Sequence, residues 1–144
     1  HTLGFAVDDA HLRPEHPGWN GGWVMVQAED LSARAITESL RAGRFYSSMG
    51  PEFRAIRMED GAVTVETSPV QFVRLVGPAS RGQRVGTYAP GAPLCEATLT
   101  VPEDWAYAYL EIEDACGRRA WTNTLAPYNG HDSWPLGEDV ETGD

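Results

Sequence analysis

The chain has 144 residues, of which 42% are hydrophobic, and its formal net charge is −10 at pH 7. This length suffices for one domain with a hydrophobic core, or for one domain plus an appendage. The strongly basic residues are all arginines, and so acidic a chain is poorly suited to a nucleic-acid backbone, which requires clustered Lys and Arg. We therefore expect no nucleic-acid partner. Because no apolar stretch is long enough to cross a bilayer and no signal pattern begins the chain, we expect no membrane partner and a cytoplasmic protein.

The first expected element is a β-strand, formed by the apolar run Leu3-Gly4-Phe5-Ala6-Val7 and followed by Asp8-Asp9-Ala10-His11. The side-chain period of two in a strand would place Asp9 and His11 on one face, where both could bind a divalent metal ion. Asp8 would not bind the metal directly; it would orient one of the ligands or contact a metal-bound water. Catalytic zinc takes three protein ligands plus water, so we expect this chain alone to bind no metal tightly. The simpler interpretation is a strand end whose acids and imidazole face solvent.

The second expected element is an α-helix that begins after Ser32, a residue type suited to accept hydrogen bonds from the first-turn amides. Ile36 and Leu40 repeat at i and i+4, and Gly43 suits the left-handed position that ends a helix. Before the helix, glycines alternate with tryptophans between Gly18 and Trp23. This segment fits an active-site loop and a packed connection equally well.

The hydrophobic pattern changes to period two from about Phe53 to Leu125. Glu59-Asp60-Gly61 and Asp114-Ala115-Cys116-Gly117 fit hairpin turns. Six or seven short strands at this spacing predict an antiparallel β-sandwich. Apart from the strand around Val63 and Val65 and the strand of Ala108 to Ile112, strands are expected at Gln71–Val76, Glu96–Val101 and Arg119–Leu125, with a short edge strand at Val85–Tyr88.

The cysteines and large aromatics of this region are interpreted as core residues. Cys95 and Cys116 lie in or beside expected strands, which favours two buried thiols over a cross-sheet disulfide. Trp105, Tyr109 and Trp121 fit the packing of a sandwich core. The alternative is an aromatic platform for a sugar or peptide ligand.

Three segments resemble the end of a PHP domain (polymerase and histidinol phosphatase family): Asp8-Asp9-Ala10-His11, Gly21 to Ala28, and Ala35 to Glu52. The resemblance implies a distorted barrel of alternating strands and helices that binds divalent metals and hydrolyses phosphoesters. The last metal motif of the family, Asp-x-His, corresponds to Asp9 and His11. The expected cofactor is therefore a divalent metal, Mn, Zn or Fe, in the intact parent protein.

This chain lacks some features of the family pattern and contains others. The earlier His-x-His motif and the further His and Glu ligands have no counterpart here, so the resemblance implies an upstream barrel of the same protein as partner. Tyr109 to Asp114 followed by Gly117 to Asn123 resembles a β-sandwich extension that follows the barrel in some PHP-type proteins.

The sequence thus predicts a mainly β fold in three parts. Residues 1–50 would be the remnant of a PHP-type α/β barrel, with its last strand, loop and helix; residues 51–126 the antiparallel β-sandwich; and residues 127–144 an acidic tail. The leading functional hypothesis is the C-terminal part of a metal-dependent phosphoesterase, a hydrolase, that is inactive alone. The alternative is a β-sandwich that serves as a binding, interaction or dimerisation module. A remnant without its barrel must pack on the sandwich, pair with a second copy in a homo-oligomer, or be poorly ordered.

Overall fold

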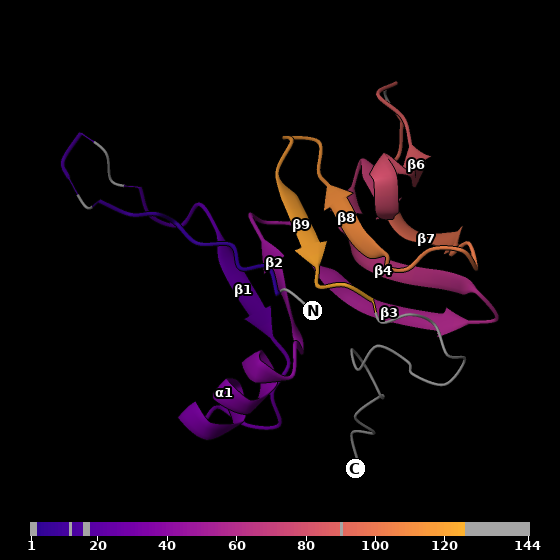
Figure 1. Cartoon of the computed structure of the whole chain (residues 1–144). Helices are drawn as coiled ribbons and strands as arrows, with labels where there is room; N and C mark the ends of the chain where they lie inside the picture. The colour runs from indigo at the N-terminus through magenta and orange to yellow at the C-terminus, as the bar shows by residue number, and fades with distance from the viewer. Residues whose placement is uncertain (1–2, 12, 16–17, 90, 126–144) are drawn as a thin grey trace, which may run out of the picture.

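The computed structural model describes residues 3–11, 13–15, 18–89 and 91–125. The fold is mainly β, its described strands pair antiparallel, and one α-helix accompanies them (Figure 1). The prediction of a mainly β fold with antiparallel sheets is confirmed. The expected acidic tail at 127–144 lies outside the described residues. The elements are β1 (Trp23–Val26), α1 (Ala33–Arg41), β2 (Phe45–Ser48), β3 (Phe53–Glu59), β4 (Ala62–Val70), β5 (Phe72–Val76), a short 3-10 helix (Pro78–Ser80), β6 (Gly82–Gly86), β7 (Leu94–Thr100), β8 (Tyr109–Glu113) and β9 (Arg119–Thr122).

The described strands form two sheets, a six-stranded sheet in the order β1-β2-β9-β8-β5-β6 and a three-stranded sheet in the order β3-β4-β7. Strands β1 and β2 come from the first fifty residues, yet β2 pairs with β9, with Tyr46 opposite Thr122. The two early strands are therefore part of the larger sheet, the first of the arrangements expected for this segment. The barrel origin of residues 1–50 stays a prediction.

Both sheets contribute to one hydrophobic core. Its residues include Ile56, Val63 and Val65 from β3 and β4, and Leu75 and Leu110 from β5 and β8. Strands β4 and β8 alternate inward apolar residues with outward, mostly polar ones, which is the pattern that the sequence showed. Burial of this apolar surface is the main force that holds the sheets together.

The two sheets meet along the edge strands β6 and β7. The Gln83 side chain in β6 donates from Nε2 to the carbonyl oxygen of Thr100 in β7. Its Oε1 accepts from the Thr100 amide at 3.3 Å. The Gln83 side chain therefore satisfies both backbone groups of Thr100, as a paired strand would, and links the edges of the two sheets.

The outward face of β5, β8 and β9 carries an ion-pair network. Arg74 lies 2.8 Å from Glu111 and 2.9 Å from Glu113, and the Arg119 side chain donates to Glu113 at 3.0 Å. The side chains of Arg74 and both glutamates are less than 20% exposed, at 18%, 13% and 11%. Charges this far out of water require partners, and this network supplies them across β5, β8 and β9.

The helix and hairpin signals are confirmed. Ser32 Oγ accepts from the Ala35 amide at 3.1 Å, and Gly43 has a φ of 74° just after the helix. In the β3–β4 hairpin, Asp60 and Gly61 have φ values of 48° and 76°. Positive φ at both turn residues is typical of the type I′ turn, whose twist matches that of the paired strands.

The expected strand at Leu3 to Val7 is wrong, because residues 3–11 belong to no strand. The Ser47 side chain forms hydrogen bonds with the Gly4 carbonyl oxygen and the Ala6 amide. The segment therefore lies on the face of the larger sheet instead of along an edge. The pattern of alternating apolar residues cannot separate these two placements.

The expected burial of the thiols is also wrong, since Cys95 and Cys116 are both free and exposed. Cys116 lies in the β8–β9 turn, and Cys95 lies beyond a register shift in the β4–β7 pair that ends the regular alternation. Of the aromatics, Trp105 belongs to the core as expected. Trp121 does not: it lies on the outward face, where its Nε1 donates to Glu111 at 2.8 Å.

Gly86 offers a test of how β6 ends. Its φ is 111°, and a Cβ added there would lie 2.0 Å from the Gln71 carbonyl oxygen. We expect Gly86→Ala to lower the free energy of unfolding by about 2–4 kcal/mol, because strain and a backbone clash add. The matched control is Gly91→Ala, where nothing lies within 4 Å of the added Cβ. Equal urea midpoints for the two variants would contradict this account.

Candidate metal centre

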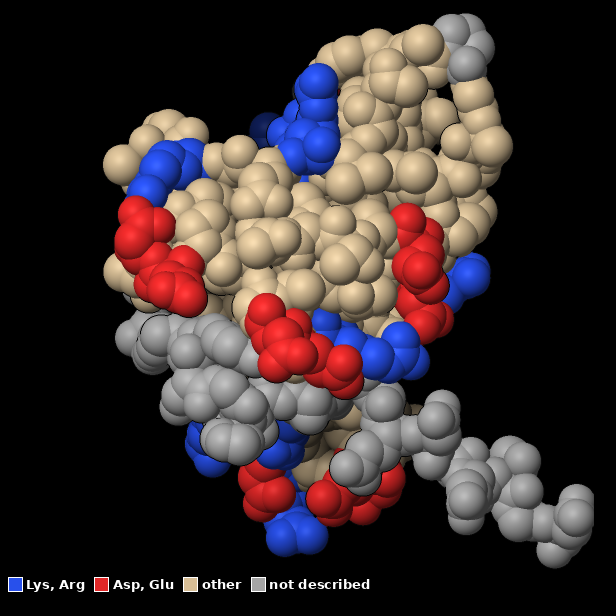
Figure 2. All heavy atoms as spheres, turned by 90° about the vertical axis from the view of Figure 1, so that its right-hand side faces the viewer, with Lys and Arg blue, Asp and Glu red and all other residues tan. Residues whose placement is uncertain are grey.

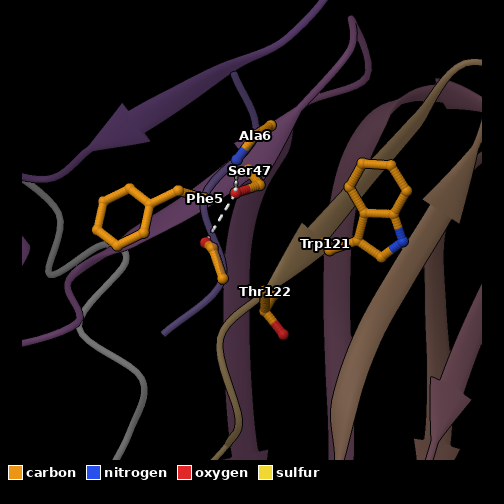
Figure 3. Close-up of a pocket in the computed structure, with 6 residues that line it drawn as sticks. Phe5, Ala6, Ser47, Trp121 and Thr122 are labelled. Atoms are coloured by element: carbon orange, nitrogen blue, oxygen red, sulfur yellow. Dashed lines mark hydrogen bonds between the residues drawn. The ribbon is translucent and has the colours of Figure 1, made fainter. Parts of the chain in front are cut away.

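The N-terminal segment is held on the larger sheet by hydrogen bonds to its backbone. Ser47 Oγ accepts from the Ala6 amide at 2.9 Å and donates to the Gly4 carbonyl oxygen at 2.9 Å (Figure 3). Just after β9, Asn123 Oδ1 accepts from the Gly4 amide at 3.0 Å. Two side chains, Ser47 on β2 and Asn123 just after β9, thus fix residues 4–6.

Ring packing adds to these bonds. The Phe5 ring lies 4.5 Å from the Phe45 ring, which is buried. A hollow of about 220 Å³ separates the segment from Trp121, which lies on the side opposite Phe5 (Figure 3). The Phe5 side of the segment is therefore packed on β2.

Asp8 fixes the chain just before the expected ligands. Its carboxylate accepts from three consecutive amides, those of Asn20 at 2.8 Å, Gly21 at 2.7 Å and Gly22 at 2.9 Å. The amide of Gly22, followed by those of Asn20 and Gly21, holds the pKa of this carboxyl below its ordinary value. These hydrogen bonds close the base of the loop that begins at Asp8, and the described residues of the loop extend away from the sheets beyond β1 (Figure 1).

Asp9 and His11 lie in this loop with an irregular backbone. Asp9 has a φ of 48°, so strand alternation does not place the two side chains. The His11 Nδ1 lies 2.8 Å from the Asp9 carbonyl oxygen. A carbonyl oxygen can only accept, so Nδ1 carries the proton, and in the neutral ring Nε2 keeps its lone pair. This is the arrangement in which metal-binding histidines are usually held.

The same loop forms a hollow of about 350 Å³ lined by Asp9, His11, Arg13 and Gly18. A carboxylate and an imidazole nitrogen suit Zn, Mn and Fe. Two donors fall short of a catalytic zinc site, and the described residues contain no cluster of three or more His, Cys, Asp or Glu that could hold a metal. A metal ion bound at this hollow would need further ligands besides Asp9 and His11.

Three residues that shape this region could not be identified from the sequence. Arg13 brings a fixed positive charge to the hollow, and Ser47 and Asn123 position the segment from strands far along the chain. No motif marks Arg13, and a lone Ser or Asn carries no signal. Asp8 faces the Asn20–Gly22 turn, and its expected role behind a metal ligand stays a prediction.

Comparisons add no family assignment. No family model matches the chain, and neither the curated proteins nor the solved structures give a match. Among the described residues, no helix has the length and apolar character that crossing a bilayer requires.

The Asp8 contacts predict a pH response of the loop. Because the folded-state pKa is depressed, the carboxylate stabilises the loop fully above the ordinary value of 3.8, and this contribution is lost as the pH falls through the folded-state pKa. We expect the amide proton shifts of Asn20, Gly21 and Gly22 to titrate together, with a midpoint below 3.8, and Asp8→Asn to abolish the transition. A midpoint at or above 3.8 would contradict the geometry.

The Ser47 hydroxyl predicts how firmly the N-terminal segment is held. We expect Ser47→Ala to remove two hydrogen bonds and to lower the free energy of unfolding by about 1–2 kcal/mol. Hydrogen exchange at the Ala6 amide should accelerate, while exchange at Val65 in the core of β4 serves as an internal control. Unchanged exchange at Ala6 would show that the ring contact and the Asn123 hydrogen bond hold the segment without Ser47.

Proposed function

We propose that this chain is the C-terminal part of a PHP-type metal-dependent phosphoesterase, and that it carries the last Asp-x-His ligand pair of that site. The supporting observation is the hollow where Asp9, His11 and Arg13 lie together. The sequence resemblance and this grouping of a carboxylate, an imidazole and a guanidinium favour the same chemistry, metal-assisted attack on a phosphoester.

The chain's own residues have separate tasks under this proposal. Asp9 and the Nε2 atom of His11 would supply two metal ligands, with Asp8 holding the loop that carries them. Arg13 would contact substrate phosphate oxygens, for which a planar guanidinium is well suited. A bound Mn, Zn or Fe ion would supply the Lewis acidity that lowers the pKa of water and neutralises phosphate charge. The chain alone would be inactive, because the remaining ligands belong to the upstream barrel.

We further propose that the two sheets act as a β-sandwich accessory to that barrel. Their shared core and the ion pairs on β5, β8 and β9 make them a rigid base for the N-terminal segment. The division at residue 50 between a barrel remnant and the sandwich belongs to this proposal. In the described part, β2 crosses that division by pairing with β9.

The second candidate function is a binding module without catalysis. It is favoured by a separate cavity at β6 and β7 whose described lining carries no charged side chain. Figure 1 shows β6 and β7 on the right and the chain that contains Asp8 to His11 on the left. The two candidates are compatible, because they use different residues.

Weak metal binding can be located by paramagnetic broadening. We expect sub-stoichiometric Mn²⁺ added to the ¹⁵N-labelled chain to broaden amide signals of residues 8–13 and 18–22 selectively, because Asp9 and His11 are the nearest donors. The double variant Asp9→Ala, His11→Ala should abolish this pattern. Asp30→Ala, which removes an exposed acid elsewhere, should leave it unchanged.

The outcomes separate three cases. Broadening confined to the loop and lost in the double variant supports the ligand pair. Equal broadening at many acidic sites, or loop broadening that survives in the double variant, would overturn it. Stoichiometric, tight Zn²⁺ binding in calorimetry would contradict the expectation that this chain needs further ligands.

A further inference from the structure

The cavity at β6 and β7 lies between the loop that follows β6, the β4–β5 corner and the β8–β9 turn. Its volume is about 490 Å³, which lies within the range of small-molecule sites. The lining residues include Val70, Gln71, Tyr88, Leu94 and Ala115. Charged side chains are absent from the described lining, in a chain with a net charge of −10.

The backbone at Gly86 opens this space. Gly86 ends β6 with a φ of 111°, and the close approach of the Gln71 carbonyl oxygen leaves no room for a side chain. The chain leaves the larger sheet here and enters the smaller sheet at Leu94, where β7 begins. Figure 2 shows this loop arching away from the body at the top of the view, with no acidic side chain on it.

Gln71 keeps the loop in place and leaves one polar atom available. Its Nε2 donates to the Thr87 carbonyl oxygen at 3.0 Å. In the described part of the chain, its Oε1 has no hydrogen-bond partner. An amide oxygen can only accept, so a ligand that pairs with it must be a donor.

Tyr88 provides an aromatic surface in the lining of the same cavity. The residue is 71% exposed, although it lines the cavity. The Phe72 ring supports it edge-on at 4.6 Å, and the Arg84 guanidinium lies 5.7 Å from its ring centre. A supported, exposed ring is a surface on which a planar ligand can pack.

From these observations, we propose that the cavity binds an uncharged small molecule with a planar ring and one hydrogen-bond donor. The ring packs against Tyr88 and the apolar walls, and the donor pairs with Gln71 Oε1. A charged ligand would lose hydration without gaining an opposite charge in the lining. This site is independent of the Asp9 and His11 pair.

Indole is a suitable probe, because it has a planar ring and one N–H donor, and 1-methylindole is its matched control without the donor. We expect indole to shift the amide signals of Gly86, Thr87, Ala89 and Gly91 and the Gln71 side-chain amide of the full ¹⁵N-labelled chain, saturably. The 1-methyl analogue should bind about fivefold more weakly, since one hydrogen bond is lost.

Two variants test the location and the hydrogen bond. Ala115→Leu adds a bulkier side chain to the cavity lining and should weaken indole binding about tenfold or more, whereas Ala106→Leu, at an exposed alanine outside the cavity, should not. Gln71→Met should abolish the difference between the two probes. That comparison remains informative if the variant loosens the loop, because both probes experience the same loop.

The opposing outcomes are equally definite. Equal affinity for the two probes in the unmodified chain, or indole binding unaffected by Ala115→Leu, would overturn the proposal. So would indole binding that begins only after removal of residues 126–144, since the occupant would then be the chain's own C-terminal segment. Saturation by a proline-rich peptide but not by indole would assign the cavity to a protein partner instead.

Discussion

The pairing of β2 with β9 is the constraint on which the other features of the described chain depend. It places Ser47 of β2 opposite Trp121 of β9 in one sheet. On the outward face, it creates the surface that Ser47 and Asn123 use to hold the N-terminal segment. Without this pairing, β1 and β2 would be separated from the rest of the larger sheet, and Asn123 would no longer lie beside Gly4.

Local signals in the sequence were sufficient for the elements that close over a few residues. Ser32 and Gly43 bound the helix, and the Asp60-Gly61 turn and the alternation around it mark the β3–β4 hairpin. Long-range features were not accessible in this way. The segment Leu3 to Val7 has the composition of a strand, and only the distant Ser47 hydroxyl decides that it lies across the sheet. Trp121 likewise carries an apolar ring to the outward face, because Glu111 accepts its N–H there.

The candidate sites divide in the same way. Asp9 and His11 form a short sequence motif that can be read directly. Arg13 belongs to no motif, and it lies beside them only because of the path of the loop. The cavity by β6 could not be predicted from the composition. Glycine, alanine and proline in a loop predict a turn and give no sign that the loop lines a cavity. Its uncharged lining contrasts with the ion pairs of Arg74 and Arg119 on the same sheet. The larger sheet thus presents two kinds of surface, one satisfied by its own charges and one that a neutral molecule can complete.

The bond between Gly4 and Asn123 also bears on the order in which the protein folds. These residues are 119 positions apart, whereas β3 and β4 pair across a two-residue turn. Contacts between distant residues form late, because closing a long loop costs more entropy than closing a short one. During synthesis, the segment with Asp9 and His11 leaves the ribosome before Asn123 exists to hold it. The candidate ligand pair would therefore take its final position only after β9 has joined the sheet.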